Sequence, residues 1–434
     1  MDKDYKQEEY DPYEHRKVEK PSSDIRATAN LIKASLGSGL LAGPLAFSNA
    51  GWGLGLIGTL LIGFICGHCI HILVKTSLGC CKIERKPLLS YAETCKAAFQ
   101  NGPIPLRSYA NAASIFAEFS LLCTYVGVCC IYTVLISDSI KQLIDKYVPS
   151  VNISIEMYCL ITLIPLCMLC QIKYLKWLAI FSILANLFLF LTYLICLYYI
   201  FANEISLYDK KVVGNPARIP AFISTVIFAM EGIGVVMPVE NAMKKPQHFL
   251  GCPSVLVVAM SAIVFFYSTL GVFGYLRYGD VLRGSITLNL PIDDWPAIFA
   301  KIFIALSIFF TYPLQFFVVF DIIKKYTDGC IKDKYRTSID IVSRSLGVCF
   351  CVGIGIALPL LEQIINIVGA CFYSILGLII PGIIETVFRW QNLGKYNWIL
   401  WKNILIVLFG VGSLISGCTV TIMDIIKILN NKIE

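Results

Sequence analysis

The sequence predicts an all-α polytopic membrane protein with eleven transmembrane helices, of which the first and the sixth are broken. The chain of 434 residues is 57% hydrophobic and only 15% charged, a composition too apolar for an ordinary soluble domain. It contains eleven apolar stretches, each long enough to cross a bilayer. Two of them are interrupted by glycine and proline at matching places in two halves of the chain, which predicts an internal repeat.

The elements follow in order from the amino terminus. Residues 1–26 are polar and charged, so we expect a disordered tail on the cytosolic side. The apolar stretches that follow are Ala27–Ala50, Trp52–Ser77, Asn111–Ser137, Ser154–Gln171, Trp177–Phe201, Ile219–Met243, Ser254–Leu276, Trp295–Phe320, Ser345–Leu361, Gln363–Phe388 and Asn403–Ile426.

Five stretches precede the second interruption, and an odd number of crossings gives the two halves opposite orientations. Residues 27–201 (helices 1–5) and 219–388 (helices 6–10) therefore form an inverted five-plus-five repeat of the leucine-transporter type. Residues 403–426 add an eleventh helix.

The basic residues determine the predicted orientation. The net charge of +7 does not indicate a nucleic-acid partner, because Lys and Arg are spread over short loops between the apolar stretches. Most of them lie in the segments that are cytosolic when the amino terminus is inside, as the positive-inside rule requires. The carboxyl terminus is then extracytosolic. The acceptor sequence Asn152-Ile153-Ser154 falls in an outside loop, so Asn152 is a candidate glycosylation site.

The longest predicted cytosolic loop, residues 78–109, contains a helix signal. Ser90 and Glu93 have the spacing of a capping box, and Asn101-Gly102-Pro103 is a stop signal. We expect a short interfacial helix between these two signals.

The first interruption is Gly37-Ser38-Gly39-Leu40-Leu41-Ala42-Gly43-Pro44, and the second is Glu231-Gly232-Ile233-Gly234-Val235-Val236-Met237-Pro238. Each glycine disfavours a helix interior by roughly 1 kcal/mol and each proline by about 3 kcal/mol. Within lipid, unwound backbone persists only where it is buried in protein or lines a polar cavity. Matched interruptions in two halves therefore indicate a transporter's substrate site.

The same segments resemble a known family. Residues 37–51, His68-Cys69-Ile70-His71 and residues 228–241 are similar to the proton-coupled amino acid transporters of the amino acid/auxin permease family, and Asp11-Pro12-Tyr13-Glu14-His15-Arg16 is similar to insect-type members. The resemblance implies uptake of small neutral amino acids of the glycine, alanine and proline class together with a proton. One position departs from it: family members commonly have a histidine where this chain has Asn30, and asparagine does not titrate.

The interruptions suit a zwitterion, which needs partners for a carboxylate and for an ammonium group. Amides freed around Gly37, Ser38 and Gly39 are candidate partners of the carboxylate. Carbonyls near Phe228, Ala229 and Gly232 are candidate partners of the ammonium group. The alternative, that the glycines only allow close helix packing, does not explain the paired prolines.

Ionisable and aromatic residues within the stretches complete the candidate site. Glu231 is the first candidate for proton coupling and Glu118 the second, although each also fits a permanently paired structural carboxylate. Tyr132 and Tyr312 are placed deep enough to line the cavity, or to serve as helix contacts. His68 and His71 favour polar contacts or a proton relay over metal binding, so we expect neither a metal nor a cofactor.

The sequence thus favours a secondary active transporter of small neutral amino acids, working by proton symport and alternating access. Sodium-coupled or uncoupled transport is the nearest alternative, encouraged by Asn30, and an amino acid sensor with little flux is another. No nucleophile elbow, phosphate loop or zinc motif indicates an enzyme. The predicted location is the plasma membrane or a lysosomal or endosomal membrane, and the oligomeric state is left open.

Overall fold

A computed structural model of the chain describes residues 10–16, 18, 21–148, 153–172, 175–202, 204–230, 232–327 and 336–433. The regular elements of these residues are helical, apart from one isolated bridge between Ser22 and Met243. The helices are α1 (Asp24–Leu41), α2 (Gly43–Ala50), α3 (Trp52–Glu84), α4 (Tyr91–Gln100), α5 (Ile104–Arg107), α6 (Ala110–Tyr147), α7 (Ile155–Cys170), α8 (Leu175–Phe201), η1 (Pro216–Arg218), α9 (Ile219–Met230), α10 (Ile233–Asn241), α11 (Gln247–Leu250), α12 (Val255–Tyr278), η2 (Ile286–Asn289), α13 (Trp295–Thr327), α14 (Arg336–Ala357), α15 (Leu361–Ile367), η5 (Val368–Ile379), α16 (Ile380–Phe388), η6 (Lys395–Asn397) and α17 (Trp398–Ile433).

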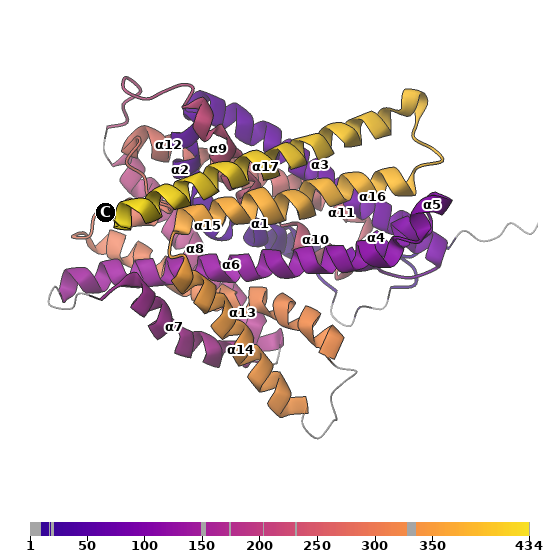
Figure 1. The fold of residues 1–434 in the computed structure, drawn as a ribbon, viewed down its shortest axis with the longest axis horizontal. Coiled ribbons are helices and arrows are strands. Elements are labelled where there is room, and N and C mark those ends of the chain that lie inside the picture. Colours follow the sequence, from indigo (N-terminus) through magenta and orange to yellow (C-terminus); the bar gives the residue numbers. More distant parts are fainter. Residues whose placement is uncertain are drawn as a thin grey trace, which may run out of the picture.

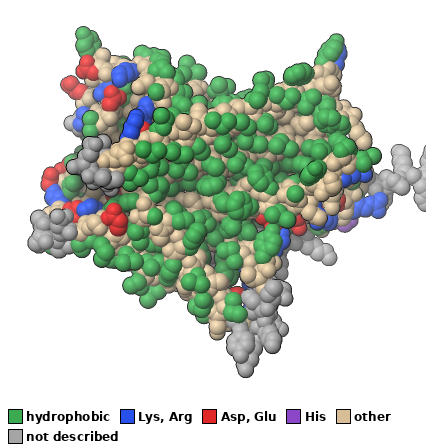
Figure 2. Space-filling view, in the orientation of Figure 1, with side chains coloured by type: hydrophobic (Ala, Val, Ile, Leu, Met, Phe, Trp, Pro, Cys, Tyr) green, Lys and Arg blue, Asp and Glu red, His purple; other side chains and the backbone are tan. Residues whose placement is uncertain are grey.

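The helices form a multi-pass membrane protein. Figure 2 shows hydrophobic side chains covering a broad band across the molecule, with charged side chains gathered towards its two ends. Within the described residues, nine helical segments are long and apolar enough to cross a bilayer: Trp52–Glu84, Ala110–Tyr147, Ile183–Phe201, Pro216–Asn241, Val255–Tyr278, Trp295–Thr327, Arg336–Ala357, Leu361–Phe388 and Lys395–Asn430. The two remaining predicted stretches correspond to the pair α1 and α2 and to α7, which has 16 residues.

Several helices continue beyond the apolar stretches that predicted them. Helix α6 runs on to Tyr147, ten residues past the predicted end at Ser137, and α13 runs on to Thr327. These extensions are more polar, as expected of helix ends that continue beyond the lipid, and their backbone still forms helical hydrogen bonds.

The packing places the two interrupted regions in the middle of the bundle. Helix α1 packs against α9, α10 and α12, and α2 packs against α9 and α12. Helices α6, α15, α16 and α17 run along the long axis of the molecule (Figure 1). Helix α9 also packs against η5, a π-helical segment that joins α15 to α16.

The short helix predicted in the loop of residues 78–109 is present as α4. Ser90 caps it, and the Ser90 and Glu93 side chains make both reciprocal hydrogen bonds of a capping box. The helix ends at Gln100, directly before the predicted stop signal. This prediction is confirmed.

The expectation of an unstructured tail over residues 1–26 does not hold for its described part. Helix α1 already begins at Asp24, where Ser23 caps it. Arg16 is buried against the rest of the protein by an ion pair with Glu240. Polar composition hid these contacts because their partners lie more than 200 residues away in the sequence.

Candidate functional site

The first interruption has two breaks in its helical geometry. Gly37 has φ −22° and ψ −126°, which lies outside the helical region, so the chain kinks there within α1. A second break follows at Ala42, after which α2 begins with Pro44 in its first turn. The kink at Gly37 thus lies inside a segment that is otherwise assigned as one helix.

The second interruption is shorter than predicted. Helix α9 ends at Met230 and α10 begins at Ile233, with Gly232 at the junction. The carbonyl of Gly232 accepts a hydrogen bond from the amide of Val235, so it already belongs to the first turn of α10. Pro238 lies inside α10 rather than in an unwound segment. The stretch from Ile233 to Pro238 was predicted to be open, and this part of the prediction is wrong.

The two interruptions lie directly against each other. A methyl group built on Gly39 would lie 2.8 Å from Cα of Ala229 and 3.3 Å from the Phe228 ring. A methyl group built on Gly232 would lie 2.8 Å from Oγ of Ser35. Glycine is therefore needed at both points for α1 to approach α9 and α10 so closely.

One predicted lining residue reaches this junction. The hydroxyl of Tyr132 in α6 would lie 3.2 Å from a methyl group on Gly37, so it faces the kink. Nε2 of Gln315 in α13 donates a hydrogen bond of 3.4 Å to the same hydroxyl. Tyr132 is thus an oriented polar group at the boundary of the interrupted segment.

The other predicted tyrosine has different surroundings. Tyr312 is fully buried in α13, its ring stacks on Phe316 with centroids 6.5 Å apart, and its hydroxyl has no hydrogen-bond partner among the described residues. Its electrostatic neighbours are the thiols of Cys129, Cys130, Cys170 and Cys351. Tyr312 does not lie within 4 Å of a methyl group built on Gly37, unlike Tyr132.

Glu118 has two partners at the far end of α13. Its carboxylate accepts hydrogen bonds from Nζ of Lys325 and from the hydroxyl of Tyr326. The Glu118 side chain is only 9% exposed, whereas the Lys325 side chain is 61% exposed. This geometry is that of a paired structural carboxylate, the alternative that the sequence left open.

Three of the predicted site positions are described in part or not at all. Glu231 and Asn152 lie outside the described residues, and for Ser38 the structure describes the backbone, which is helical, but not the side chain.

Three residues near the junction were missed by the sequence analysis. The hydroxyl of Thr225 in α9 donates a 2.7 Å hydrogen bond to Oδ1 of Asn366, a buried amide at the end of α15. The rings of Phe228 and Tyr373 meet edge to face, with centroids 5.8 Å apart. Polar residues inside apolar stretches are the signal that could have found Thr225 and Asn366.

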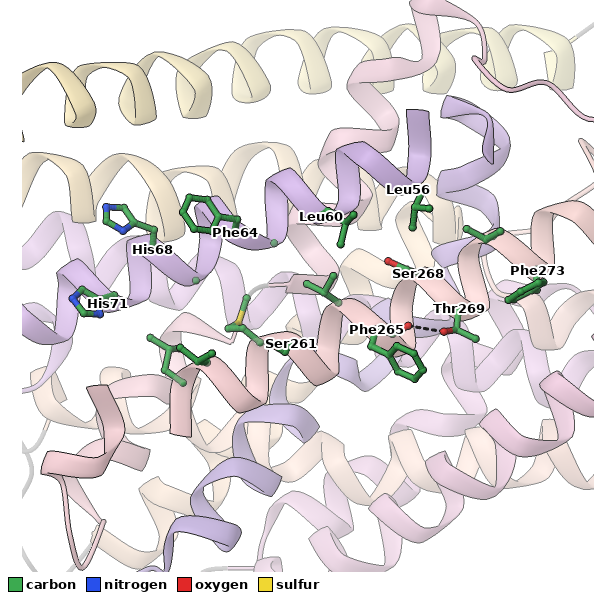
Figure 3. Close-up of a pocket in the computed structure, with 17 residues that line it drawn as sticks. Leu56, Leu60, Phe64, His68, His71, Ser261, Phe265, Ser268, Thr269 and Phe273 are labelled. Carbon is green, nitrogen blue, oxygen red and sulfur yellow. Dashed lines mark hydrogen bonds between the residues drawn. The ribbon is translucent and has the colours of Figure 1, made fainter. Parts of the chain in front are cut away.

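A large cavity lies elsewhere, between α3 and α12. It has a volume of about 880 Å³ and is lined mostly by apolar side chains. Figure 3 shows His68 and His71 at one end of this cavity, and their rings are parallel with centroids 6.3 Å apart. No cluster of three or more metal-ligating side chains occurs among the residues that the structure describes.

The comparisons with known proteins assign the chain to a family. The family profile described as "Transmembrane amino acid transporter protein" matches residues 20–423. The chain belongs to this transmembrane amino acid transporter family. The resemblance noted from the motifs is thereby confirmed, and membership implies a transporter rather than an enzyme.

Relatives within the family carry transporter names. The chain is 41% identical to the proton-coupled amino acid transporter-like protein pathetic of Drosophila melanogaster, over 98% of this chain and 90% of the relative. It is 27% identical to vacuolar amino acid transporter 3 of Saccharomyces cerevisiae, over 72% of this chain and 43% of that relative.

The fold of this chain is similar to that of a solved structure. The inward-facing conformation of Mhp1 aligns with a TM-score of 0.57 and 13% sequence identity, covering 96% of this chain and 92% of the other. At this identity the likeness concerns the fold alone.

Proposed function

We propose that this amino acid transporter carries small neutral amino acids together with protons, by alternating access to one site at the two interruptions. The observation that carries the proposal is the contact of Gly39 with Ala229, which brings both interrupted helices to one point. The kink at Gly37 and the end of α9 would expose peptide dipoles of both signs there, and a zwitterion needs both.

The geometry supports a division of roles between the two helices. Helix α9 ends at Met230, so its last carbonyls, including those of Phe228 and Ala229, suit the ammonium group. Amides after the kink at Gly37, those of Ser38 and Gly39, suit the carboxylate. The carbonyl of Gly232 already accepts a hydrogen bond within α10, so the N–H group of Gly232 is the better candidate contact for the substrate.

The walls of the junction favour a small side chain. The Phe228 ring and the Tyr132 hydroxyl stand next to Gly39 and Gly37, respectively. Bulky substrates would have to displace one of these aromatic residues. Glycine, alanine and proline are the substrates that fit this description.

Proton coupling is proposed for Glu231, which is the next residue after α9 and lies at the junction by sequence. Glu118 is less suited to this role, since its two carboxylate oxygens already accept hydrogen bonds from Lys325 and Tyr326. Sodium coupling is the second candidate. It is favoured by Asn30, which is exposed on α1 and replaces the histidine common in relatives of this type.

In the proposed topology the amino terminus is cytosolic, the carboxyl terminus is extracytosolic, and residues 27–201 and 219–388 form inverted repeats. Asn152 then lies in an extracytosolic loop, where it is proposed to be glycosylated. The membrane is proposed to be the plasma membrane or a lysosomal or endosomal membrane.

Uptake into proteoliposomes tests this function. The protein should accumulate labelled alanine against its concentration gradient when the proton gradient is directed inward. Uptake that is unaffected when the proton gradient is collapsed, but lost when choline replaces sodium, would favour sodium coupling instead. Saturable binding with no flux under either gradient would favour the sensor.

A further inference from the structure

The residues before α1 are tied to the end of α10 by a buried ion pair. Nη1 of Arg16 lies 2.8 Å from Oε1 of Glu240, and the exposed fractions of the two side chains are only 4% and 1%. The same nitrogen also donates a 3.4 Å hydrogen bond to the backbone carbonyl of Glu240. Breaking a buried pair of this kind is costly, because one uncompensated charge remains buried.

Arg16 also contacts two other parts of the chain. Its Nε donates a 2.9 Å hydrogen bond to the carbonyl of Pro87, in the loop between α3 and α4. Its guanidinium carbon lies 5.0 Å from the centre of the Tyr13 ring. Burial, followed by the charge of Glu240, raises the pKa of Tyr13 to about 12, so the phenol is neutral at physiological pH.

Two further contacts follow the ion pair along the chain. Ser22 donates its amide to the carbonyl of Ala242 (2.7 Å) and accepts from the amide of Lys244 (2.8 Å), forming a parallel bridge with Met243. Nδ1 of His248 lies 2.6 Å from Oδ2 of Asp24 at the start of α1. We call the described residues of 10–23 the amino-terminal strap.

The strap therefore connects the first residues of α1 with the last residues of α10. These two helices flank the substrate junction proposed above, on the side that the topology assigns to the cytosol. In the proposed alternating-access cycle, α1 and α10 separate to open a path from the junction to that side. The contacts of the strap are the ones that such a separation must break.

We propose that the amino-terminal strap locks the cytosolic gate of the transporter. Arg16 and Glu240 hold α1 against α10 while the gate is closed, and they separate when the gate opens. This inference rests on the proposed function, since it names the device that controls access to that site.

A covalent lock tests whether the strap must release. Residues facing each other across a parallel bridge lie about 4.8 Å apart, which is within disulfide reach. The double variant Ser22→Cys/Met243→Cys, oxidised and verified by mass spectrometry of the cross-linked peptide, should lose alanine uptake and regain it with a reductant. Cross-linked protein that transports at the rate of the reduced protein overturns the proposal.

The matched control joins two elements that need not separate. The hydroxyls of Ser77 in α3 and Thr94 in α4 lie 3.0 Å apart at the same end of the bundle. Oxidised Ser77→Cys/Thr94→Cys protein should transport normally. Equal losses in both cross-linked variants would attribute the effect to general rigidification and overturn the proposal.

A second variant weakens the lock without burying a lone charge. Arg16→Met/Glu240→Gln removes both charges and should favour the cytosol-open state. A tenfold shift in that equilibrium would raise the extracytosolic KM by up to about tenfold and lower the cytosolic KM towards its intrinsic value. If the ion pair only stabilised the fold, the variant would change the extracytosolic KM and the cytosolic KM by the same factor.

The control pair for this measurement is Lys402 and Glu385, a 2.7 Å ion pair with exposed fractions of 19% and 6% that joins α17 to α16. Lys402→Met/Glu385→Gln should leave the ratio of the two KM values unchanged. Uptake by the wild-type protein distinguishes a failure of the proposed function from a failure of the strap proposal. No amino acid uptake by the unmodified protein refutes the proposed function, whereas normal uptake by both wild-type and locked protein refutes the strap alone.

Discussion

Replacing Gly39 by alanine adds one methyl group at the point where α1 meets α9. That methyl would lie 2.8 Å from Cα of Ala229 and 3.1 Å from its Cβ. Carbon atoms in favourable contact are about 3.5–4.0 Å apart, so the two helices must move apart by about 0.7 Å. The obstacle is largely backbone, which cannot rotate away as a long side chain can.

The size of the effect follows from two opposing contributions. Overpacking a tight contact costs about 1–3 kcal/mol, while alanine in place of glycine favours the helix by about 1 kcal/mol. The contact is largely with backbone, so the upper part of this cost range, about 2–3 kcal/mol, applies. The net penalty on the closed, substrate-bound state is then about 1–2 kcal/mol, which corresponds to a loss of about 5- to 30-fold in apparent affinity. We therefore expect Gly39→Ala to raise the KM for alanine by this factor.

Two glycines elsewhere provide controls. Gly353 in α14 and Gly412 in α17 have no atom within 4 Å of an added methyl group. Gly353→Ala and Gly412→Ala should keep the wild-type KM in the same proteoliposome uptake assay. A wild-type KM for Gly39→Ala would refute the reasoning, because it would mean that the contact between the interrupted helices does not shape the substrate site.

Three further outcomes follow from the site. Tyr132→Phe should raise the KM for alanine about fivefold, because it removes one hydrogen bond with a net value of about 1 kcal/mol. Tyr312→Phe removes a hydroxyl that has no partner among the described residues, so it should leave the KM unchanged. Equal effects of the two variants in uptake assays would contradict this reasoning. Glu231→Gln should abolish the dependence of uptake on external pH, and a retained pH profile would exclude Glu231 as the proton carrier. Glu118→Gln should keep that pH profile and lower stability by only about 0.5–1 kcal/mol in thermal unfolding, because its partner Lys325 is largely exposed; a flattened profile would return proton coupling to Glu118.

Local sequence was sufficient to predict the apolar helices, of which nine among the described residues are long enough to cross a bilayer. Length and apolarity define a membrane span, and glycine and proline act on the few residues around them. The extent of the second interruption was overestimated, since tertiary packing keeps Ile233 to Pro238 helical despite a glycine and a proline.

The face of each helix could not be predicted in the same way. Tyr132 and Tyr312 were both judged by their depth in apolar stretches, yet of the two only Tyr132 lies within 4 Å of a methyl group built on Gly37. Helices that are apolar all round carry no stripe to indicate which side turns inward, and successive residues differ by about 100° in direction. Depth alone therefore did not separate these two tyrosines.

Ion pairs between residues that are far apart in the sequence could not be predicted either. The Glu118 carboxylate meets Lys325, and Glu240 meets Arg16, across separations of more than 200 residues. The charge of each residue is visible in the sequence, but a single sequence holds no record of which opposite charge the fold brings to it. This is why the tail was expected to be free and Glu118 was considered for proton coupling.

The most direct test of the substrate site is a cryo-electron microscopy structure of the protein with bound alanine. We predict density for the amino acid between residues 37–39 of the first interruption and residues 228–232 of the second, with Tyr132 beside it. Density in the cavity between α3 and α12, with the junction of the interrupted helices empty, would contradict the account.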